Sequence, residues 1–468
     1  MITDEADESL TKWECLRKKV QIKLRKADME IKLFRINQLS DAEKEKLMQR
    51  SMQDVASIYD YVREIIYDVR DRKDKSLVES LKEIKKGISE EELLVSEEEI
   101  KQAYEKVDKK LVDYLRIASE NIKKFHSGQL EKELWAIKVS EGIIAGRLAR
   151  PIEKAGCYVP GGIASYPSSV LMCTIPAKVA GVKEVFIATP PQKGMNINPL
   201  VLVAADLVGI NRIFKIGGPW AIAAFAVGTN VIPKVDKIVG PGNKYVTAAK
   251  MIVYSLGMVD IDMPAGPSEA LIIADESANP EWLAVDFLSQ IEHDPDSSAI
   301  LISTSEKIAQ EVAQIISVKY DQLPRKEVYE SSLSKYSYIL IAKNIEEAVE
   351  FANEYAPEHL QIVTREPFLV LQKIKHAGSI FLGAYAPVPV GDYASGTNHV
   401  LPTGKGAKMF SGLSVDDFIK KPTFQYITKD GLENLKDVVV GLAKEEGLPM
   451  HAEAVKVRFD GCDRIKKD

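Results

Sequence analysis

Hydrophobic and polar positions follow two different periods along this chain of 468 residues. Residues 1–56 are strongly charged and helical in pattern, with LFRINQL as the main apolar patch. Residues 57–137 continue as amphipathic helices with faces rich in Glu and Lys. The first segment has too few apolar positions to bury itself, so we expect a helical arm that docks on another domain or subunit.

From Pro151 onward, short β-branched runs alternate with helical segments, as in EVFIATP, PLVLVAADLVG, RIFKIGG and AIAAFAVGT. A second alternation runs from SAILIST to SIFLGA. Buried-looking strands separated by helices predict parallel sheets covered on both faces. The expected fold class is α/β, with two tandem Rossmann-like domains, parallel-rich sheets, and small helical or mixed segments at the N- and C-termini.

One predicted helix ends in two polar side chains. Asn279 and Pro280 form a helix start, and apolar residues then recur at helical spacing as far as Ile291. Gln290 and His293, three residues apart near its end, lie on one helix face and can point at a common atom. An amide oxygen and an imidazole nitrogen suit zinc, but for the pair taken alone a polar helix end in solvent is the better explanation.

Composition excludes several classes of protein. A net charge of −6 and a pI near 5.8 give no basic surface for nucleic acid. The longest apolar runs are too short to span a bilayer, and the acidic start MITDEADES lacks a signal-peptide pattern, so we expect a cytoplasmic location. The four cysteines are scattered, and we interpret Cys157 and Cys173 as buried packing rather than nucleophiles.

Glycine-rich turns punctuate the first alternation at Pro160–Gly162, Gly217–Gly218 and Gly240–Asn243. Glycine at a strand-to-helix turn lets the backbone approach a ligand, and a helix N-terminus favours phosphate. No turn matches GxGxxG followed by an acidic residue, so the usual dinucleotide signature is absent. Tight turns without a ligand and a cofactor cleft at one end of a sheet are equally supported.

Several of the six histidines lie in polar loops. Glu358 and His359 are adjacent in YAPEHL, a pairing suited to acid/base chemistry. His399 shares the loop GDYASGTNHVLPTG with Asp392, and His451 follows Glu446 in EEGLPMH. Gln290, His293, Asp392 and His451 would together make one metal site with oxygen and nitrogen ligands and room for a substrate. His126 and His376, on charged helical segments, are expected at the surface.

Eight motifs carry a family resemblance: YVPGGIASYPSSVLM, VDKIVGPGNKYVTAAK, DMPAGPSEALIIAD, LSQIEHDP, YAPEHL, GDYASGTNHVLPT, SGLSVDDF and EEGLPMHAEAV. Together they resemble the histidinol dehydrogenase family over residues 57–458. The resemblance implies an oxidoreductase of histidine biosynthesis, which oxidises L-histidinol through L-histidinal to L-histidine with the reduction of two NAD. It also implies one zinc ion per subunit and a homodimer with shared active sites, with no nucleic acid or membrane partner.

Roles follow from the resemblance for individual residues. Gln290, His293, Asp392 and His451 would bind the zinc ion, which orients the substrate, and His451 would come from either subunit. Glu358 and His359 would be the catalytic acid/base pair, with His359 as general base near pKa ~6.5 and Glu358 activating water. The substrate would contact these zinc ligands and His359, together with Ser268, His399 and Glu446. NAD would contact Tyr158, Trp220 and Asn243.

The resemblance also suggests domain limits. We expect a helical arm at 1–56, a first α/β domain from 57–137 and 268–413 with the metal and acid/base residues, a second α/β domain at 138–267 on the NAD side, and a small C-terminal domain at 414–468.

Two positions depart from the family pattern. Trp220 stands where Gln usually touches the cofactor, and Val388 stands where some members carry Glu near the substrate. Trp can stack on a ring but cannot accept a hydrogen bond. The residues therefore leave three alternatives: a dehydrogenase of another alcohol in the same family, a zinc hydrolase that uses Glu358 to activate water, and a catalytically silent subunit.

Overall fold

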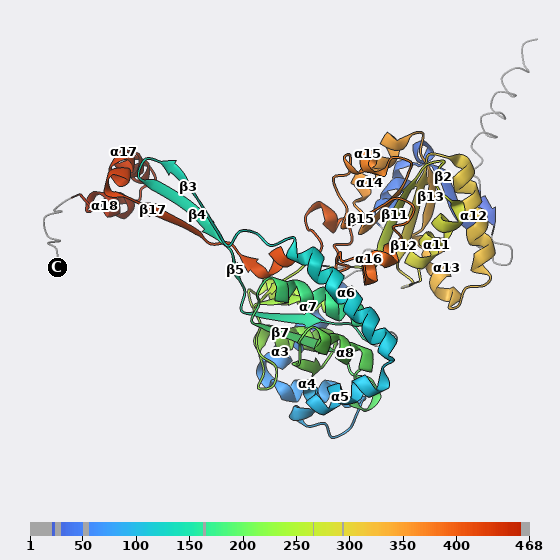
Figure 1. Ribbon diagram of the computed structural model, residues 1–468, viewed down its shortest axis with the longest axis horizontal. Coiled ribbons are helices and arrows are strands. Elements are labelled where there is room, and N and C mark those ends of the chain that lie inside the picture. Colours follow the sequence, from blue (N-terminus) through green and yellow to red (C-terminus); the bar gives the residue numbers. More distant parts are fainter. Residues whose placement is uncertain are drawn as a thin grey trace, which may run out of the picture. The chain divides into compact units, whose positions relative to one another are not determined.

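The computed structural model describes residues 21–23, 30–49, 56–161, 165–264, 266–292 and 294–459. The chain divides into two compact units, residues 1–129 with 153–417 and residues 130–152 with 418–468. The first unit contains two sheets covered by helices, which confirms the predicted α/β class with parallel-rich sheets (Figure 1). Among the described residues, no helix is both long and apolar enough to cross a membrane.

The larger sheet has seven strands in the order β1-β2-β13-β12-β11-β14-β15, all parallel except the β1–β2 pair. Successive residues of its central strands enter two different apolar clusters, because side chains alternate across a sheet. Helices α11 and α12 complete one cluster and α14 the other. The strands are β1 (Gln21–Lys23), β2 (Glu30–Arg35), β11 (Glu269–Ala274), β12 (Ser298–Ser303), β13 (Tyr338–Ile341), β14 (His359–Val363) and β15 (Ser379–Leu382). The helices are α2 (Asp41–Gln49), α11 (Pro280–Gln290), α12 (Glu306–Tyr320), α13 (Lys326–Lys335), α14 (Ile345–Tyr355), α15 (Pro367–Leu371) and α16 (Val388–Tyr393).

The N-terminal segment differs from the expected helical arm. Strand β2 joins the seven-stranded sheet beside β13, and only α2 and a short 3₁₀ turn in its described part are helical. Ile31 and Leu33 are buried on one face of this strand. The alternation of apolar and polar residues covers only six residues within a charged segment, so the sequence does not distinguish this strand from a helix. Residues 1–20 and 24–29 lie outside the described part of the chain.

The smaller sheet of this unit has five parallel strands in the order β10-β9-β6-β7-β8. Its strands are β6 (Lys154–Tyr158), β7 (Glu184–Thr189), β8 (Ile213–Lys215), β9 (Lys237–Val239) and β10 (Asp260–Ile261). Its helices are α7 (Pro167–Val179), α8 (Pro199–Leu207), α9 (Gly218–Val227) and α10 (Lys244–Ser255). Helices α8 and α9 are largely apolar, because α8 packs against α5 (Glu97–Lys106) and α7, and α9 packs against α3 (Tyr59–Arg72), α10 and the sheet.

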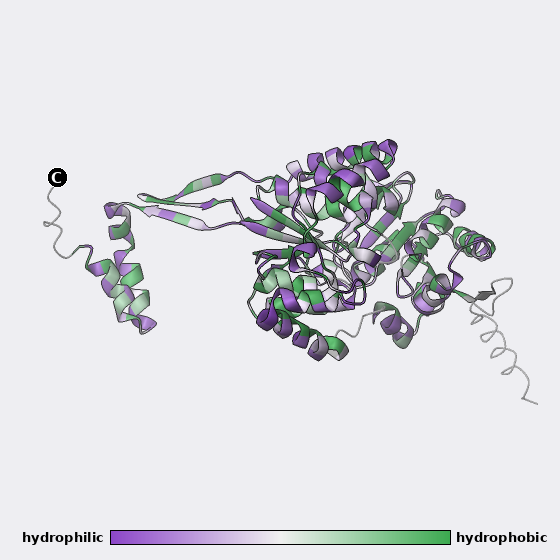
Figure 2. Cartoon of the chain, turned by 90° about the horizontal axis from the view of Figure 1, so that it is seen from below, coloured by the Kyte–Doolittle hydropathy of each residue, from purple (hydrophilic) through white to green (hydrophobic). Residues whose placement is uncertain are grey.

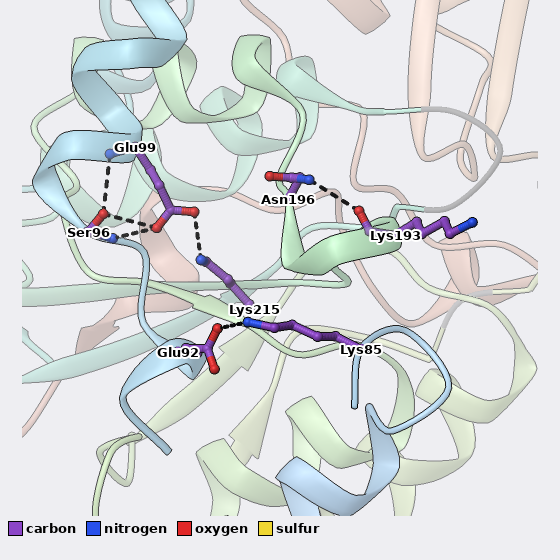
Figure 3. A network of polar contacts seen from close by, with 7 residues as sticks. All are labelled: Lys85, Glu92, Ser96, Glu99, Lys193, Asn196 and Lys215. Atoms are coloured by element: carbon purple, nitrogen blue, oxygen red, sulfur yellow. Dashed lines mark hydrogen bonds and ion pairs between the residues drawn. The ribbon is translucent and has the colours of Figure 1, made fainter. Parts of the chain in front are cut away.

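Four helices between residues 59 and 127 pack against this five-stranded domain, whereas the sequence predicts one domain that combines residues 57–137 with residues 268–413. They are α3 (Tyr59–Arg72), α4 (Asp74–Ser80), α5 (Glu97–Lys106) and α6 (Lys109–Ser127). Val62, Ile66 and Leu93 share one apolar cluster with Phe214 and Phe225. Ser96 caps α5, and Glu99 of that helix forms an ion pair with Lys215 at the end of β8, 2.6 Å apart (Figure 3). An amphipathic face does not specify its partner, which is why the sequence does not indicate which sheet these helices cover.

The second unit combines residues 418–468 with residues 130–152, whereas the sequence predicts that residues 130–152 belong to the two α/β domains. Strands β3 (Leu134–Ser140), β4 (Ile143–Leu148) and β17 (Thr423–Ile427) form an antiparallel sheet, and β5 (Arg150–Pro151) pairs with β16 (Ile419–Lys420). Helices α17 (Lys429–Glu445) and α18 (Pro449–Lys456) follow. Figure 2 shows hydrophobic segments along these strands and helices. Exposed apolar residues on them include Ile137, Val139, Leu442 and Met450.

Candidate active site

Glu358 and His359 lie where β14 begins, and both are buried, with 6% and 4% of their surface exposed. Helix α14 ends at Tyr355, and Ala356 with φ of 50° turns the chain through Pro357 into the strand. Strand pairing then sets His359 opposite Ala270 of β11 and Ser379 of β15. Glu358 and His359 are therefore held at the N-terminal end of a central strand.

The main chain of Glu269 orients the side chains of Glu358 and His359. Its N–H donates to Glu358 Oε2 over 2.8 Å, and its carbonyl lies 3.2 Å from His359 Nδ1. A carbonyl only accepts, so Nδ1 carries a hydrogen and Nε2 is the ring atom left for proton transfer. That Nε2 is buried, lies 3.6 Å from Asp392 Oδ1, and has no hydrogen-bond partner within the described chain.

Two carboxylates face the His359 ring. Burial lowers the pKa of His359, but Glu358 and Asp392 together outweigh it and raise the pKa to about 10. Glu358 Oε2 lies 3.4 Å from Nδ1. The sequence predicts an ordinary pKa of ~6.5 for His359, which is too low because a linear pattern shows no neighbouring charges. The site therefore stabilises the charged form of His359, and the ring must lose its second proton before Nε2 can act as a base.

The loop after α16 brings Asp392 and His399 together. His399 Nδ1 lies 2.9 Å from the Asp392 carbonyl and donates to it, while the Ser169 hydroxyl donates to His399 Nε2 over 3.1 Å. Burial lowers the pKa of His399, which favours this neutral tautomer. Val388 begins α16 one turn before Asp392 and is itself buried.

His126 supports the same loop, so the expectation that it lies at the surface was wrong. Its side chain is fully buried, its Nδ1 lies 2.8 Å from Gln129 Oε1, and its Nε2 lies 3.4 Å from Asn398 Nδ2. Asn398 also donates to the Met172 carbonyl. The charged neighbours of His126 in the sequence belong to the other faces of α6.

The predicted metal ligands are divided among parts of the chain. Gln290 is buried at the last position of α11, and Asp392 is partly buried in α16. His293 lies outside the described residues. His451 is exposed on α18, and Glu446 is exposed at the end of α17, both in the second unit. Among the described residues, no three His, Cys, Asp or Glu side chains are arranged to hold a metal, so the predicted set remains a prediction.

The three glycine-rich turns follow β6, β8 and β9, and therefore lie at the carboxyl end of one parallel sheet. Strand order reverses between β6 and β9, where ligands of open α/β sheets usually bind. Tyr158 ends β6, and its hydroxyl accepts the N–H of Gly218 at the start of α9. Trp220 is half-buried on α9, and the Asn243 amide oxygen caps α10.

The same rule does not locate Glu358 and His359, the predicted acid/base pair. His359 and Glu269 are the first residues of β14 and β11, at the amino edge of the seven-stranded sheet. A cavity of ≈ 380 Å³ lies at its carboxyl edge, lined by residues such as Asp275, Thr304 and Arg365, and holds none of the predicted site residues.

Sequence reasoning missed Glu269 and Ser169. Glu269 contributes mainly through its main chain, which no residue pattern reveals. Ser169 reaches His399 from a distant helix. Ser268, predicted to contact substrate, directly precedes Glu269, and its carbonyl accepts the N–H of Ser298.

Comparison with known proteins supports the family resemblance that the eight motifs indicate. The family model described as histidinol dehydrogenase matches residues 48–459. Histidinol dehydrogenases of Methanocaldococcus jannaschii and Methanococcus maripaludis are each 51% identical, covering 91% of this chain and 98% and 99% of theirs. The crystal structure of histidinol dehydrogenase from Elizabethkingia anophelis aligns with a TM-score of 0.86 at 43% identity, covering 91% of this chain and 97% of that one. Fold, motifs and near full-length identity agree, and the chain belongs to the histidinol dehydrogenase family, the NAD-dependent oxidoreductases of histidine biosynthesis.

Proposed function

We propose that this chain oxidises L-histidinol through L-histidinal to L-histidine, with two NAD reduced in turn. The observation that carries the proposal is the buried His359, whose Nδ1 donates to the Glu269 carbonyl and whose Nε2 has no hydrogen-bond partner within the described chain. An alcohol can lose a hydride only as its hydroxyl proton leaves, so a fixed base at that atom is the group this reaction needs.

In the first oxidation, the neutral form of His359 takes the proton of the histidinol hydroxyl at Nε2, while NAD accepts the hydride from the carbon that bears this hydroxyl. Glu358 lies 3.4 Å from Nδ1 and stabilises the imidazolium that forms. The ring keeps its orientation throughout, because Nδ1 remains bonded to the Glu269 carbonyl.

In the second oxidation the aldehyde is first hydrated. Glu358 is the proposed group that activates the water, and His359 again takes the hydroxyl proton. Burial of both residues limits access of bulk water to the aldehyde between the two steps.

Gln290, His293, Asp392 and His451 are the proposed zinc ligands. One amide oxygen, one carboxylate and two imidazoles fit the oxygen and nitrogen ligands that zinc accepts. When bound, the ion would orient histidinol through its amine and imidazole nitrogens. Tyr158, Trp220 and Asn243 are the proposed NAD contacts, supported by their position at the carboxyl edge where strand order reverses.

A homodimer is the proposed assembly, with His451 and Glu446 reaching an active site of either subunit. Exposed apolar residues on β3 and α17 of the second unit support this assembly, since monomers rarely expose such stretches. Every residue of β3 is exposed, including Leu134, Trp135 and Ile137.

The direct test is NADH formation from L-histidinol and NAD, before and after removal of metal with a chelator and again after zinc is added back. We expect two NADH per histidinol, loss of turnover with the chelator, and recovery with zinc. Turnover of another alcohol with no response to histidinol would contradict the proposed substrate, and full activity after verified metal removal would contradict the proposed zinc role.

A further inference from the structure

A buried ion pair in the five-stranded domain has no part in the chemistry described above. Lys250 of α10 and Asp262, just after β10, form this pair with side chains that are 3% and 0% exposed. A buried ion pair adds little net stability, because removing two charges from water offsets their attraction. The pair therefore calls for an explanation other than stability.

Both members bind the main chain of one residue, Gly240. Lys250 Nζ donates to the Gly240 carbonyl over 3.1 Å, and the Gly240 N–H donates to Asp262 Oδ2 over 2.8 Å. Gly240 has φ of 120°, and a side chain there would place its Cβ 2.1 Å from the Tyr158 carbonyl oxygen. The ion pair thus fixes a backbone position that only glycine can occupy.

Gly240 opens the turn that leads from β9 to Asn243, the N-cap of α10. It lies beside Tyr158, because β6 and β9 are paired and end at the same edge. This edge is the reversal point of strand order, where the proposed NAD contacts are found. Asp262 also begins the segment that continues to Ser268 and β11.

We propose that Lys250 and Asp262 are positioning residues that hold the Gly240–Asn243 turn in the conformation that binds NAD. This inference rests on the proposed function, which assigns NAD to that edge. Without the pair, the Gly240 N–H and carbonyl lose their buried partners, and the turn spends less time in the binding conformation. The apparent affinity for NAD falls in proportion to the fraction of time that the turn is formed. A turn formed one-tenth of the time therefore binds NAD about tenfold more weakly.

The test is the double variant Lys250→Met/Asp262→Ala, which removes both charges and both side-chain partners of the Gly240 peptide groups. Its matched control is Lys237→Met/Asp260→Ala, because Lys237 and Asp260 form an ion pair between β9 and β10 at the opposite edge, 2.9 Å apart. The measurements are the NADH dissociation constant by fluorescence titration, KM for NAD, KM for histidinol, and the melting temperature. Asp262→Asn alone, which keeps an acceptor for the Gly240 N–H, serves if the double variant does not fold.

We expect the double variant to bind NADH about tenfold or more weakly with KM for histidinol unchanged, a smaller loss for Asp262→Asn, and no loss for the control. NADH affinity within about twofold of wild type in a folded variant would overturn the inference, as would equal losses for NAD and histidinol that follow a lowered melting temperature. If the wild-type chain itself does not bind NADH, the proposed function fails first and the inference falls with it.

Discussion

At the scale of single residues, the orientation of His359 separates its role from that of Glu358. His359 Nε2 faces the site, whereas Glu358 Oε2 is already bonded to the Glu269 N–H and close to Nδ1. Glu358 can therefore orient and charge-stabilise the ring as well as serve the hydration step.

Replacing these two residues should separate the two oxidations. We expect His359→Asn to fold and to lose about 10²–10⁴-fold in both oxidations, since the proton acceptor is gone. Glu358→Gln should spare the oxidation of histidinol more than that of histidinal, because only the second needs activated water. Single-turnover rates with each substrate measure this, and equal losses at both steps in Glu358→Gln would refute the division.

The cysteines should be dispensable for chemistry. Burial raises the pKa of both the Cys157 and the Cys173 thiols, so neither supplies a thiolate near neutral pH. The double variant Cys157→Ala/Cys173→Ala should keep kcat within about threefold and lose about 1–3 kcal/mol of unfolding free energy through two small cavities. A folded variant without activity would restore a covalent thiol step.

His126 should make the fold sensitive to acid. Burial lowers the pKa of His126, so the unfolded chain binds its proton more tightly and stability falls as pH drops below about 6.5. In urea unfolding between pH 7.5 and 5.5, wild type should lose more stability than His126→Gln. An identical loss in the two proteins would show that His126 does not titrate on unfolding.

At the scale of elements, the sequence predicted what is local and missed what depends on partners. Asn279 does cap α11, and the α/β alternation does form parallel sheets, because capping and period act over a few residues. Strand β2 and the packing of α3–α6 were missed, since their positions depend on surfaces far away in sequence. The adjacent Glu358 and His359 were found for the same local reason, whereas Glu269 was not.

Gly240, in the turn after β9, can be compared with Gly257, which follows α10. Gly240 and Gly257 both have positive φ, but an added Cβ at Gly257 meets nothing within 4 Å. Gly257→Ala should cost about 1 kcal/mol of backbone strain, and Gly240→Ala should cost at least about 3 kcal/mol, because Cβ would collide with main-chain atoms of Tyr158. Urea unfolding compares them, and similar costs would contradict the tight approach at Gly240.

At the scale of the whole molecule, subunit mixing tests the proposed shared sites. His359→Asn and His451→Asn should each be inactive, but if His451 serves the other subunit, a mixed dimer contains one intact site. An equal mixture, dissociated and reassembled, should then recover about a quarter of wild-type activity. No recovery despite formation of mixed dimers would place both residues in one chain's own site.

The use of the Glu269 peptide group has a practical consequence for mapping this active site. Its amide hydrogen and carbonyl oxygen meet Glu358 and His359, so every amino acid except proline supplies the same two atoms. A conventional scan of side chains would score position 269 only for what its carboxylate does. Ester replacement of the 268–269 linkage would delete that hydrogen while keeping the Glu269 side chain, and would expose the contribution of the backbone to turnover.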